Sequence, residues 1–134
     1  MPIYTVVTST STLSDQTKAT VAAEITKTHA AITGAPTSLV HVVFYDQPHA
    51  NVFTGATPSQ PMLITGLTRA GRADSDKMRL AKDISASCSR VTGIPESRIV
   101  VTIQDNPARF AVEGGRVLPE PGTENDWLDE AAAS

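Results

Sequence analysis

Hydrophobic and polar positions follow two different periods along the first half of the chain. Residues 2–8 alternate between apolar and polar types, which predicts a strand that opens on a proline. The period then lengthens to that of a helix, which Thr12 or Ser14 can cap and which runs to about Ile32. Residues 39–45 are apolar almost without interruption and predict a second strand. The apolar face of the predicted helix carries Val21, Ile25, His29 and Ile32.

The second half repeats this order of strand, helix and strand. Residues 61–67 predict a strand, and Asp74 or Ser75 is expected to cap the helix that follows. Glycine and proline end that helix, as they end the first, and residues 98–104 predict the closing strand. The apolar stripe of the second helix carries Leu80, Ile84, Cys88 and Val91.

The two halves also match residue by residue, which indicates an internal repeat. Residues 33–38 (TGAPTS) recur as residues 92–97 (TGIPES), 59 positions further along, and Pro61 matches Pro2 at the same offset. We therefore expect a single domain that spans the chain. Its parts are a first repeat at about 2–48, a second at about 61–107, and a C-terminal segment at 108–134.

Two consecutive βαβ units predict an α/β fold with a four-stranded mixed sheet. A helix-length crossover makes each strand pair parallel, and right-handed crossovers can place both helices on one face of the sheet. Residues 39–45 are nevertheless apolar enough to be buried on both sides, and the chain has no further element large enough to cover the second face. We expect copies of the chain to cover it, giving a homo-oligomer that packs sheet against sheet.

Composition and charge narrow the class of protein. The 134 residues are 40% hydrophobic and 19% charged, which is typical of a globular domain with an aliphatic core. The net charge of −3 argues against nucleic acid or an anionic membrane as the main partner. No membrane-length apolar run and no signal-peptide pattern are present, and Cys88 is the only cysteine, so we expect a cytosolic protein without disulfides. The chain has no metal-binding or phosphate-binding motif, so no cofactor is expected.

The proline at position 2 has two possible roles, one structural and one catalytic. Proline lacks a backbone N–H and is tolerated at the first residue of a strand, which is sufficient reason for its presence. Methionine is normally removed from a Met-Pro terminus, however, and removal would leave Pro2 as a secondary amine. An α-amino group titrates near neutrality and can serve in acid–base or nucleophilic catalysis.

A second group of candidate residues lies near the end of the third predicted strand and in the C-terminal segment. Arg69 and Arg72 follow a strand and precede a helix N-terminus, where two guanidinium groups suit a bidentate carboxylate. The alternative is a pair of solvated loop arginines. Glu113 precedes a Gly-Gly turn and is either a catalytic base or a turn residue paired with Arg116.

The remaining polar and aromatic residues give weaker signals. His29 is a core histidine unless its end of the helix opens onto a pocket. His41 and His49 have no companions in the sequence that indicate a site. Trp127 lies in an acidic C-terminal segment and is expected to anchor that segment or an interface.

Taken together, these residues resemble the tautomerase superfamily, and within it the cis-3-chloroacrylic acid dehalogenase family. The resemblance runs from Pro2 to about Trp127 and rests on the order and spacing of several short motifs. It implies the tautomerase, or MIF-like, fold and, because related two-repeat proteins are homotrimers, a trimer. The motifs are the Pro2 strand, 28–34 (THAAITG), 51–53 (NVF), 66–72 (GLTRAGR), 112–116 (VEGGR), 118–122 (LPEPG) and Trp127.

The resemblance also implies roles for individual residues. Pro2, once freed, is the general acid or base that handles a proton at carbon. Arg69 and Arg72 bind and polarise the substrate carboxylate, with assistance from His29. Glu113 positions or activates water where the reaction is a hydration.

One position departs from the family. The dehalogenases use a tyrosine together with the glutamate to activate water. In this chain the position of that tyrosine is taken by Thr102, which the resemblance places among the substrate-binding residues. Threonine is shorter and far less acidic, and the C-terminal tail is shorter than in the dehalogenases. The sequence therefore favours a tautomerase of small 2-keto or enol carboxylates, such as phenylenolpyruvate. The alternatives are a hydratase, cis-3-haloacrylate dehalogenase or semialdehyde decarboxylase, and a catalytically idle ligand-binding or structural oligomer.

Overall fold

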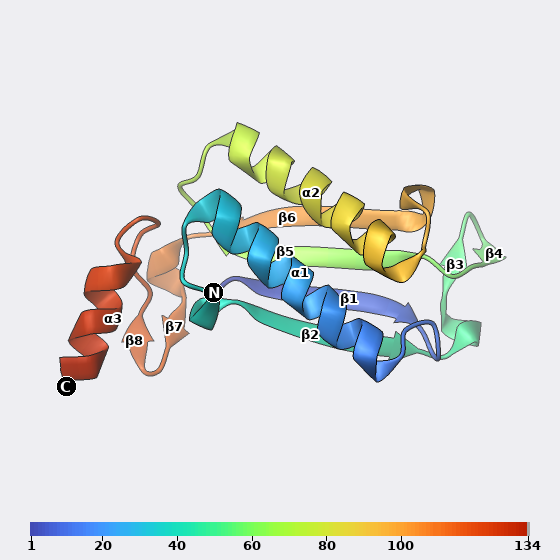
Figure 1. Ribbon diagram of the computed structural model, residues 1–134, viewed down its shortest axis with the longest axis horizontal. Helices are drawn as coiled ribbons and strands as arrows, with labels where there is room; N and C mark the ends of the chain where they lie inside the picture. The colour runs from blue at the N-terminus through green and yellow to red at the C-terminus, as the bar shows by residue number, and fades with distance from the viewer. Residues whose placement is uncertain (134) are drawn as a thin grey trace.

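The computed structural model describes residues 1–133, which form a four-stranded sheet with two long helices on one face (Figure 1). Two small hairpins and a short C-terminal helix extend from the ends of the sheet. The first repeat contributes β1 (Ile3–Ser9), α1 (Asp15–Thr33) and β2 (His41–Gln47). The second contributes β5 (Met62–Arg69), α2 (Asp74–Thr92) and β6 (Ile99–Asn106). The smaller elements are β3 (Phe53–Thr54), β4 (Thr57–Pro58), β7 (Val112–Glu113), β8 (Arg116–Val117) and α3 (Glu124–Ala133).

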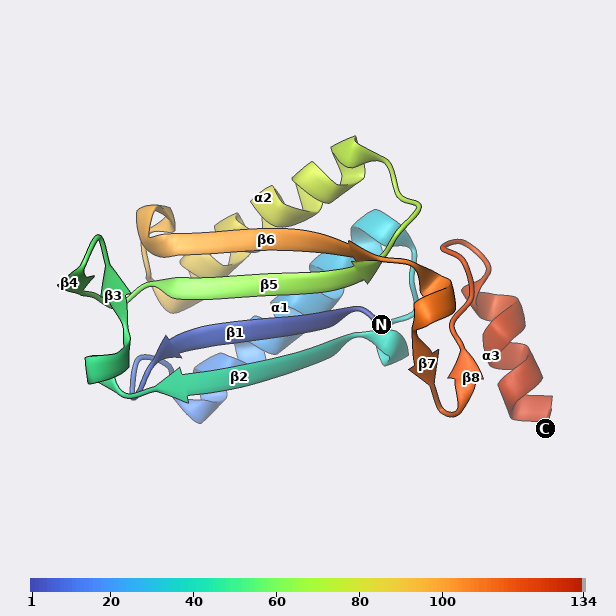
Figure 2. The same cartoon turned by 180° about the vertical axis from the view of Figure 1, so that it is seen from behind.

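The sheet has the strand order β2-β1-β5-β6. Within each repeat the two strands are parallel and joined by a helix, while the central strands β1 and β5 are antiparallel. Because both helices pack on the same face, the structure confirms the mixed sheet of two pseudo-symmetric βαβ units expected from the sequence. Seen from behind, no element of residues 1–133 covers the sheet (Figure 2).

The starts of the two long helices differ from each other. Ser14 caps α1, accepting a hydrogen bond from the Thr17 N–H at 3.1 Å, as expected. The cap predicted for α2 was wrong, because Ala73 is the N-cap residue and its side chain makes no capping bond. Asp74 instead lies in the first turn, where its charge interacts favourably with the positive end of the helix dipole.

The second strand of each repeat starts later than the sequence predicts. Short 3₁₀ turns at Thr37–Leu39 and Glu96–Arg98 follow a proline, so β2 begins at His41 and β6 at Ile99. Both strands then continue two residues beyond their predicted ends. Leu39 therefore packs in the core from a turn rather than from a strand.

The core lies between the sheet and the two helices, and a close contact at its centre involves Tyr4. The ring of Tyr4 is fully buried and crosses its strand partner Gly66, where a Cβ atom would lie 2.5 Å from the ring. The Tyr4 ring therefore fits only because residue 66 is a glycine. The helices contribute the predicted residues Val21, Ile25, Leu80, Ile84 and Cys88 to the same core.

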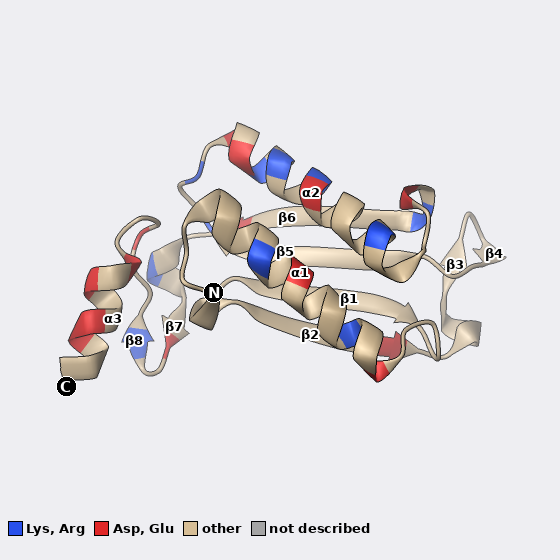
Figure 3. Cartoon of the chain, in the orientation of Figure 1, with Lys and Arg blue, Asp and Glu red and all other residues tan. Residues whose placement is uncertain are grey.

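The uncovered face of the sheet exposes several large apolar side chains. Val43 and Tyr45 on β2 are 41% and 52% exposed, and Val100 on β6 is 52% exposed. Residues 39–45, which the sequence suggests are buried on both sides, are thus buried on one side only in the single chain. Lys, Arg, Asp and Glu are concentrated instead on the helices and loops, with several acidic residues on α3 (Figure 3). Within residues 1–133, no helix is long and apolar enough to cross a membrane.

Candidate active site

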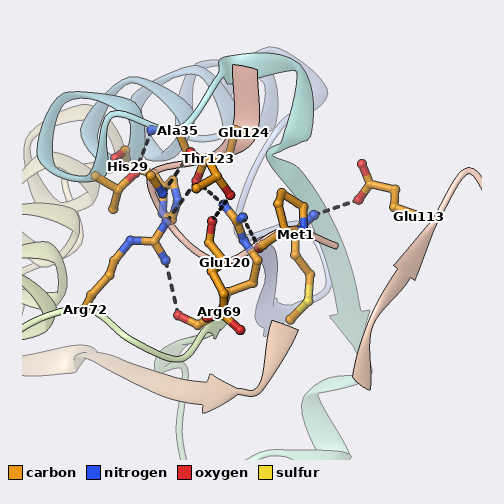
Figure 4. Close-up of polar contacts among 12 residues, drawn as sticks. Met1, His29, Ala35, Arg69, Arg72, Glu113, Glu120, Thr123 and Glu124 are labelled. Carbon is orange, nitrogen blue, oxygen red and sulfur yellow. Dashed lines mark hydrogen bonds and ion pairs between the residues drawn. The ribbon is translucent and has the colours of Figure 1, made fainter. Parts of the chain in front are cut away.

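The candidate residues from the sequence gather at one end of the sheet. Antiparallel pairing of β1 with β5 sets Ile3 opposite Leu67, which brings the start of the chain beside the end of β5. His29 arrives on the last turns of α1, and the β7–β8 hairpin and α3 lie alongside (Figure 1). The resulting group of polar side chains is shown in Figure 4.

The chain terminus forms an ion pair at this site. The Met1 amino group lies 2.6 Å from Oε1 of Glu113, and the Met1 residue is only 5% exposed. The same carboxylate oxygen lies 3.3 Å from Nε2 of His41. Burial alone would raise the pKa of Glu113, but the amino group and His41 outweigh it and hold that pKa below its usual value. With Met1 in place, Pro2 is a buried tertiary amide without a basic nitrogen.

Arg69 is completely buried and firmly held. One terminal nitrogen of its guanidinium donates to the Pro119 carbonyl at 2.8 Å, and the other donates to Oε1 of Glu124 at 2.6 Å. Its Nε atom is buried without a hydrogen-bond partner. Arg69 is therefore not a solvated loop arginine.

Arg72 lies close to the same carboxylate and to His29 (Figure 4). One terminal nitrogen donates to the Arg69 carbonyl at 3.3 Å, and the other lies 3.9 Å from Glu124 without forming a hydrogen bond. Burial and the neighbouring positive charge of Arg69 lower the pKa of Arg72. Two adjacent, partly unsatisfied guanidinium groups make this a favourable position for an added anion.

His29 is a buried histidine that also faces the arginines. Its Nδ1 atom shares a hydrogen bond of 2.8 Å with the Tyr4 hydroxyl, while its Nε2 atom has no hydrogen-bond partner. Burial, followed by the charges of Arg72 and Arg69, lowers the pKa of His29 to about 3. The imidazole is therefore neutral near pH 7, and burial raises the pKa of the Tyr4 phenol well above its usual range.

Thr102 does not join this cluster. It lies in the middle of β6, exposed on the uncovered face, and its hydroxyl lies 3.4 Å from that of Thr65. The register pairs Thr102 with Thr65 and Thr65 with Thr5, whereas the cluster lies at the Pro2 end of β1. Within one chain, Thr102 therefore makes no contact with the arginines or with Glu113.

The C-terminal segment is fixed to the site by Trp127 and Arg116. The indole N–H of Trp127 donates to the Val117 carbonyl at 2.9 Å, and the guanidinium carbon of Arg116 lies 4.5 Å from the centre of the indole ring. This bears out the expectation that Trp127 anchors the segment. Arg116 also bonds Glu130, so Glu113 and Arg116 pair through the hairpin backbone rather than as an ion pair.

Three residues of the site were not identified from the sequence. Glu124 lies 55 positions from its partner Arg69, and its only sequence signal is its place at the start of an acidic helix. In the sequence, Tyr4 is indistinguishable from an ordinary strand residue. His41 has no sequence neighbour that indicates a contact with Glu113. Among the described residues 1–133, no group of three or more His, Cys, Asp or Glu side chains is arranged to hold a metal ion.

Comparison with known proteins identifies the family. A family described as putative oxalocrotonate tautomerase enzymes matches residues 1–131, and the chain belongs to it. Among solved structures, native Ps01740 is 35% identical with a TM-score of 0.81, and the match covers 84% of this chain and 100% of that chain. N1, a member of the cis-3-chloroacrylic acid dehalogenase family, is 28% identical with a TM-score of 0.93, covering 96% and 91%. Native fused 4-OT is 25% identical with a TM-score of 0.80, covering 87% and 95%.

These matches confirm the tautomerase superfamily and its fold, as the resemblance implied. Among curated proteins, none matches the chain. The family and its dehalogenase and 4-OT neighbours make this an enzyme-like scaffold of the isomerase and dehalogenase type.

Proposed function

We propose that this protein is a tautomerase that shifts a proton in a small 2-keto or enol carboxylate. The observation that carries the proposal is the set of buried nitrogen atoms without hydrogen-bond partners beside the chain terminus. These are Nε2 of His29, Nε of Arg69 and a terminal nitrogen of Arg72. Buried polar atoms are normally satisfied, so this set is what a bound carboxylate would complete.

Removal of Met1 is the step that activates the site in this proposal. The Met1 residue is 95% buried, so its loss both frees the Pro2 nitrogen and vacates space beside the arginines. Pro2 then accepts the proton of the substrate's 2-hydroxyl group and delivers a proton to C3. The O–H bond and the C2–C3 π bond break while the C3–H and C2=O bonds form. The arginines bind the carboxylate and stabilise the negative charge that develops on the neighbouring C2 oxygen.

The matched test is phenylenolpyruvate ketonisation by protein whose mass shows that Met1 is absent. Pro2→Ala and Arg69→Ala are each expected to lower kcat/KM by at least about a hundredfold. Asp129→Asn, on the exposed side of α3, is the control and should leave the rate unchanged. Activity that persists in both of the first two variants would contradict the proposal.

A second candidate is water addition, and the ion pair at Glu113 favours it. The Glu113 carboxylate lies beside the chain's amino group and His41, where it could hold a water molecule for attack on an unsaturated three-carbon acid. This candidate is weakened by Thr102, which stands where the dehalogenases use a tyrosine. Halide release from cis-3-haloacrylate tests it, and no release beyond the uncatalysed rate excludes the dehalogenase form.

We further propose that the chain forms a homotrimer through the uncovered face of its sheet. Exposed apolar residues on all four strands support this, among them Tyr45 and Val100. Fused 4-OT proteins of the same fold are described as trimers, which supports the proposal at the level of the fold. Sedimentation equilibrium tests it, and the mass of a single chain would contradict it.

A further inference from the structure

Glu124 is the least expected member of the site and is as firmly fixed as the arginines. It is 6% exposed, and its Oε2 atom accepts a hydrogen bond from the Gly122 N–H at 3.0 Å while Oε1 accepts from Arg69. Burial alone would raise the pKa of Glu124, but the backbone hydrogen bonds and Arg69 hold it below its usual value. The carboxylate is therefore an anion at neutral pH, anchored from two sides.

This anchoring determines which nitrogen of the Arg69 guanidinium is free to bind a ligand. Both terminal nitrogens of the guanidinium already donate to protein acceptors, the Pro119 carbonyl and Glu124. Only Nε has no hydrogen-bond partner. Glu124 and Pro119 thus hold the guanidinium by its far end and fix the direction in which Nε points.

Glu124 also changes the charge that a ligand meets. Its Oε1 atom lies 2.6 Å from Arg69 and 3.9 Å from Arg72, so two cations and one anion leave a single positive charge. Glu113 and the chain's amino group together add no net positive charge, whether that amino group belongs to Met1 or, after Met1 is removed, to Pro2. His29 is neutral and adds no charge. The two arginines and Glu124 therefore carry at most one net positive charge, which matches one ligand carboxylate and not two.

We propose that Glu124 is a positioning and specificity-determining residue, which orients Arg69 and restricts the site to ligands with one carboxylate. The inference rests on the proposed function, because it assumes that the arginines bind the substrate. Glu124 acts through Arg69 and does not itself contact the substrate. In this arrangement α3 belongs to the binding site rather than only covering it.

The test compares two ligands of the same shape and different charge. 3-Carbamoylbenzoate carries one carboxylate and isophthalate carries two, and the dissociation constant of each is measured by calorimetry at low ionic strength. The wild-type protein is expected to bind 3-carbamoylbenzoate more tightly. Glu124→Gln should shift the ratio of the two constants by about tenfold toward isophthalate, because one nearby charge is removed.

Two variants separate charge from packing. Glu124→Asp keeps the charge and should keep the wild-type ratio even if both affinities fall. Asp129→Asn removes an exposed charge from the same helix and should leave the ratio unchanged. Since both ligands are measured on one preparation, the ratio does not depend on the fraction of folded protein.

The outcomes distinguish this inference from the proposed function. If neither ligand binds, or if binding survives Arg72→Ala unchanged, both the carboxylate site and the inference are wrong. If 3-carbamoylbenzoate binds through Arg72 but Glu124→Gln leaves the ratio as it was, only the inference fails. A wild-type protein that prefers isophthalate overturns the inference even if Glu124→Gln does not fold.

Discussion

Tyr4 and His29 meet through a hydrogen bond of 2.8 Å between the phenol oxygen and Nδ1, with both side chains fully buried. The bond links the first strand to the last turns of α1 and fixes the ring whose other nitrogen faces the arginines. Tyr4→Phe keeps the ring and removes the hydroxyl, leaving Nδ1 buried without its partner. We expect the free energy of unfolding to fall by about 1–2 kcal/mol, measured by urea denaturation.

The matched control is the other tyrosine of the chain. Tyr45 is 52% exposed, and Tyr45→Phe is expected to change the monomer's stability by less than about 0.5 kcal/mol. If the two substitutions cost the same, the Tyr4–His29 bond contributes nothing specific. In the active protein, Tyr4→Phe should also raise KM more than it lowers kcat, because it removes the hydrogen bond that orients His29, a proposed binding residue.

The lowered pKa of His29 predicts a pH dependence of stability. Between its folded pKa of about 3 and the unfolded value near 6.5, the unfolded state binds the proton and the folded state does not. Stability therefore rises with pH in that window and is lost as the pH falls below about 6.5. The slope due to one proton is at most about 1.4 kcal/mol per pH unit.

Urea denaturation between pH 5 and pH 6.5 isolates this contribution. The pKa values of Glu113 and Glu124 are lowered from the ordinary value of 4.5, so those carboxylates act mainly below about pH 5. His29→Gln is expected to flatten the slope, whereas His49→Gln, at an exposed position, should preserve it. An unchanged slope in His29→Gln would show that His29 is not the group responsible.

Periodicity and glycine–proline punctuation in the sequence were enough to predict the two long helices, the four main strands and their mixed sheet. The same signals missed the 3₁₀ turns after Pro36 and Pro95, because a short turn with apolar residues reads as the start of a strand. They also misplaced the cap of α2, where Asp74 and Ser75 are common cap residues but the chain enters the helix one residue earlier.

The gathering of the candidate residues was predictable where short motifs marked them and not where distant segments meet. Arg69, Arg72 and Glu113 stand next to glycine turns that mark them, and the structure brings all three close to the chain terminus. Glu124 reaches Arg69 from the start of α3, a helix that Trp127 holds against β8, and no local pattern encodes that contact. Long-range pairings of this kind depend on packing that a single sequence does not display.

The close contact between Gly66 and Tyr4 predicts a specific steric cost. A Cβ atom at Gly66 would lie 2.5 Å from the Tyr4 ring and 3.1 Å from Ile103, so the packing must shift to admit it. Gly66→Ala is expected to destabilise the protein by about 1–3 kcal/mol in urea denaturation. In a Tyr4→Leu background the same change should cost much less, and equal costs in both backgrounds would locate the strain elsewhere.

The unequal helix starts predict opposite effects of two substitutions. Ser14→Ala removes the capping bond to the Thr17 N–H and should cost about 1 kcal/mol of stability. Ala73→Ser supplies a capping hydroxyl to α2, where none exists, and should add about 0.5–1 kcal/mol. Thermal unfolding of both variants checks the pair, and a loss of stability in Ala73→Ser would contradict the assignment of Ala73 as the cap position.

The proposed trimer predicts that charge on the uncovered sheet face will disrupt assembly. Val100 on β6 and Met78 on α2 are similarly exposed, at 52% and 59%, but only Val100 lies on that face. Val100→Glu would bury an unpaired carboxylate in the interface, which is costly, so we expect dissociation to single chains. Met78→Glu adds the same charge on the helix side and should leave the assembly intact. Sedimentation velocity measures both, and an intact oligomer in Val100→Glu would place the interface elsewhere.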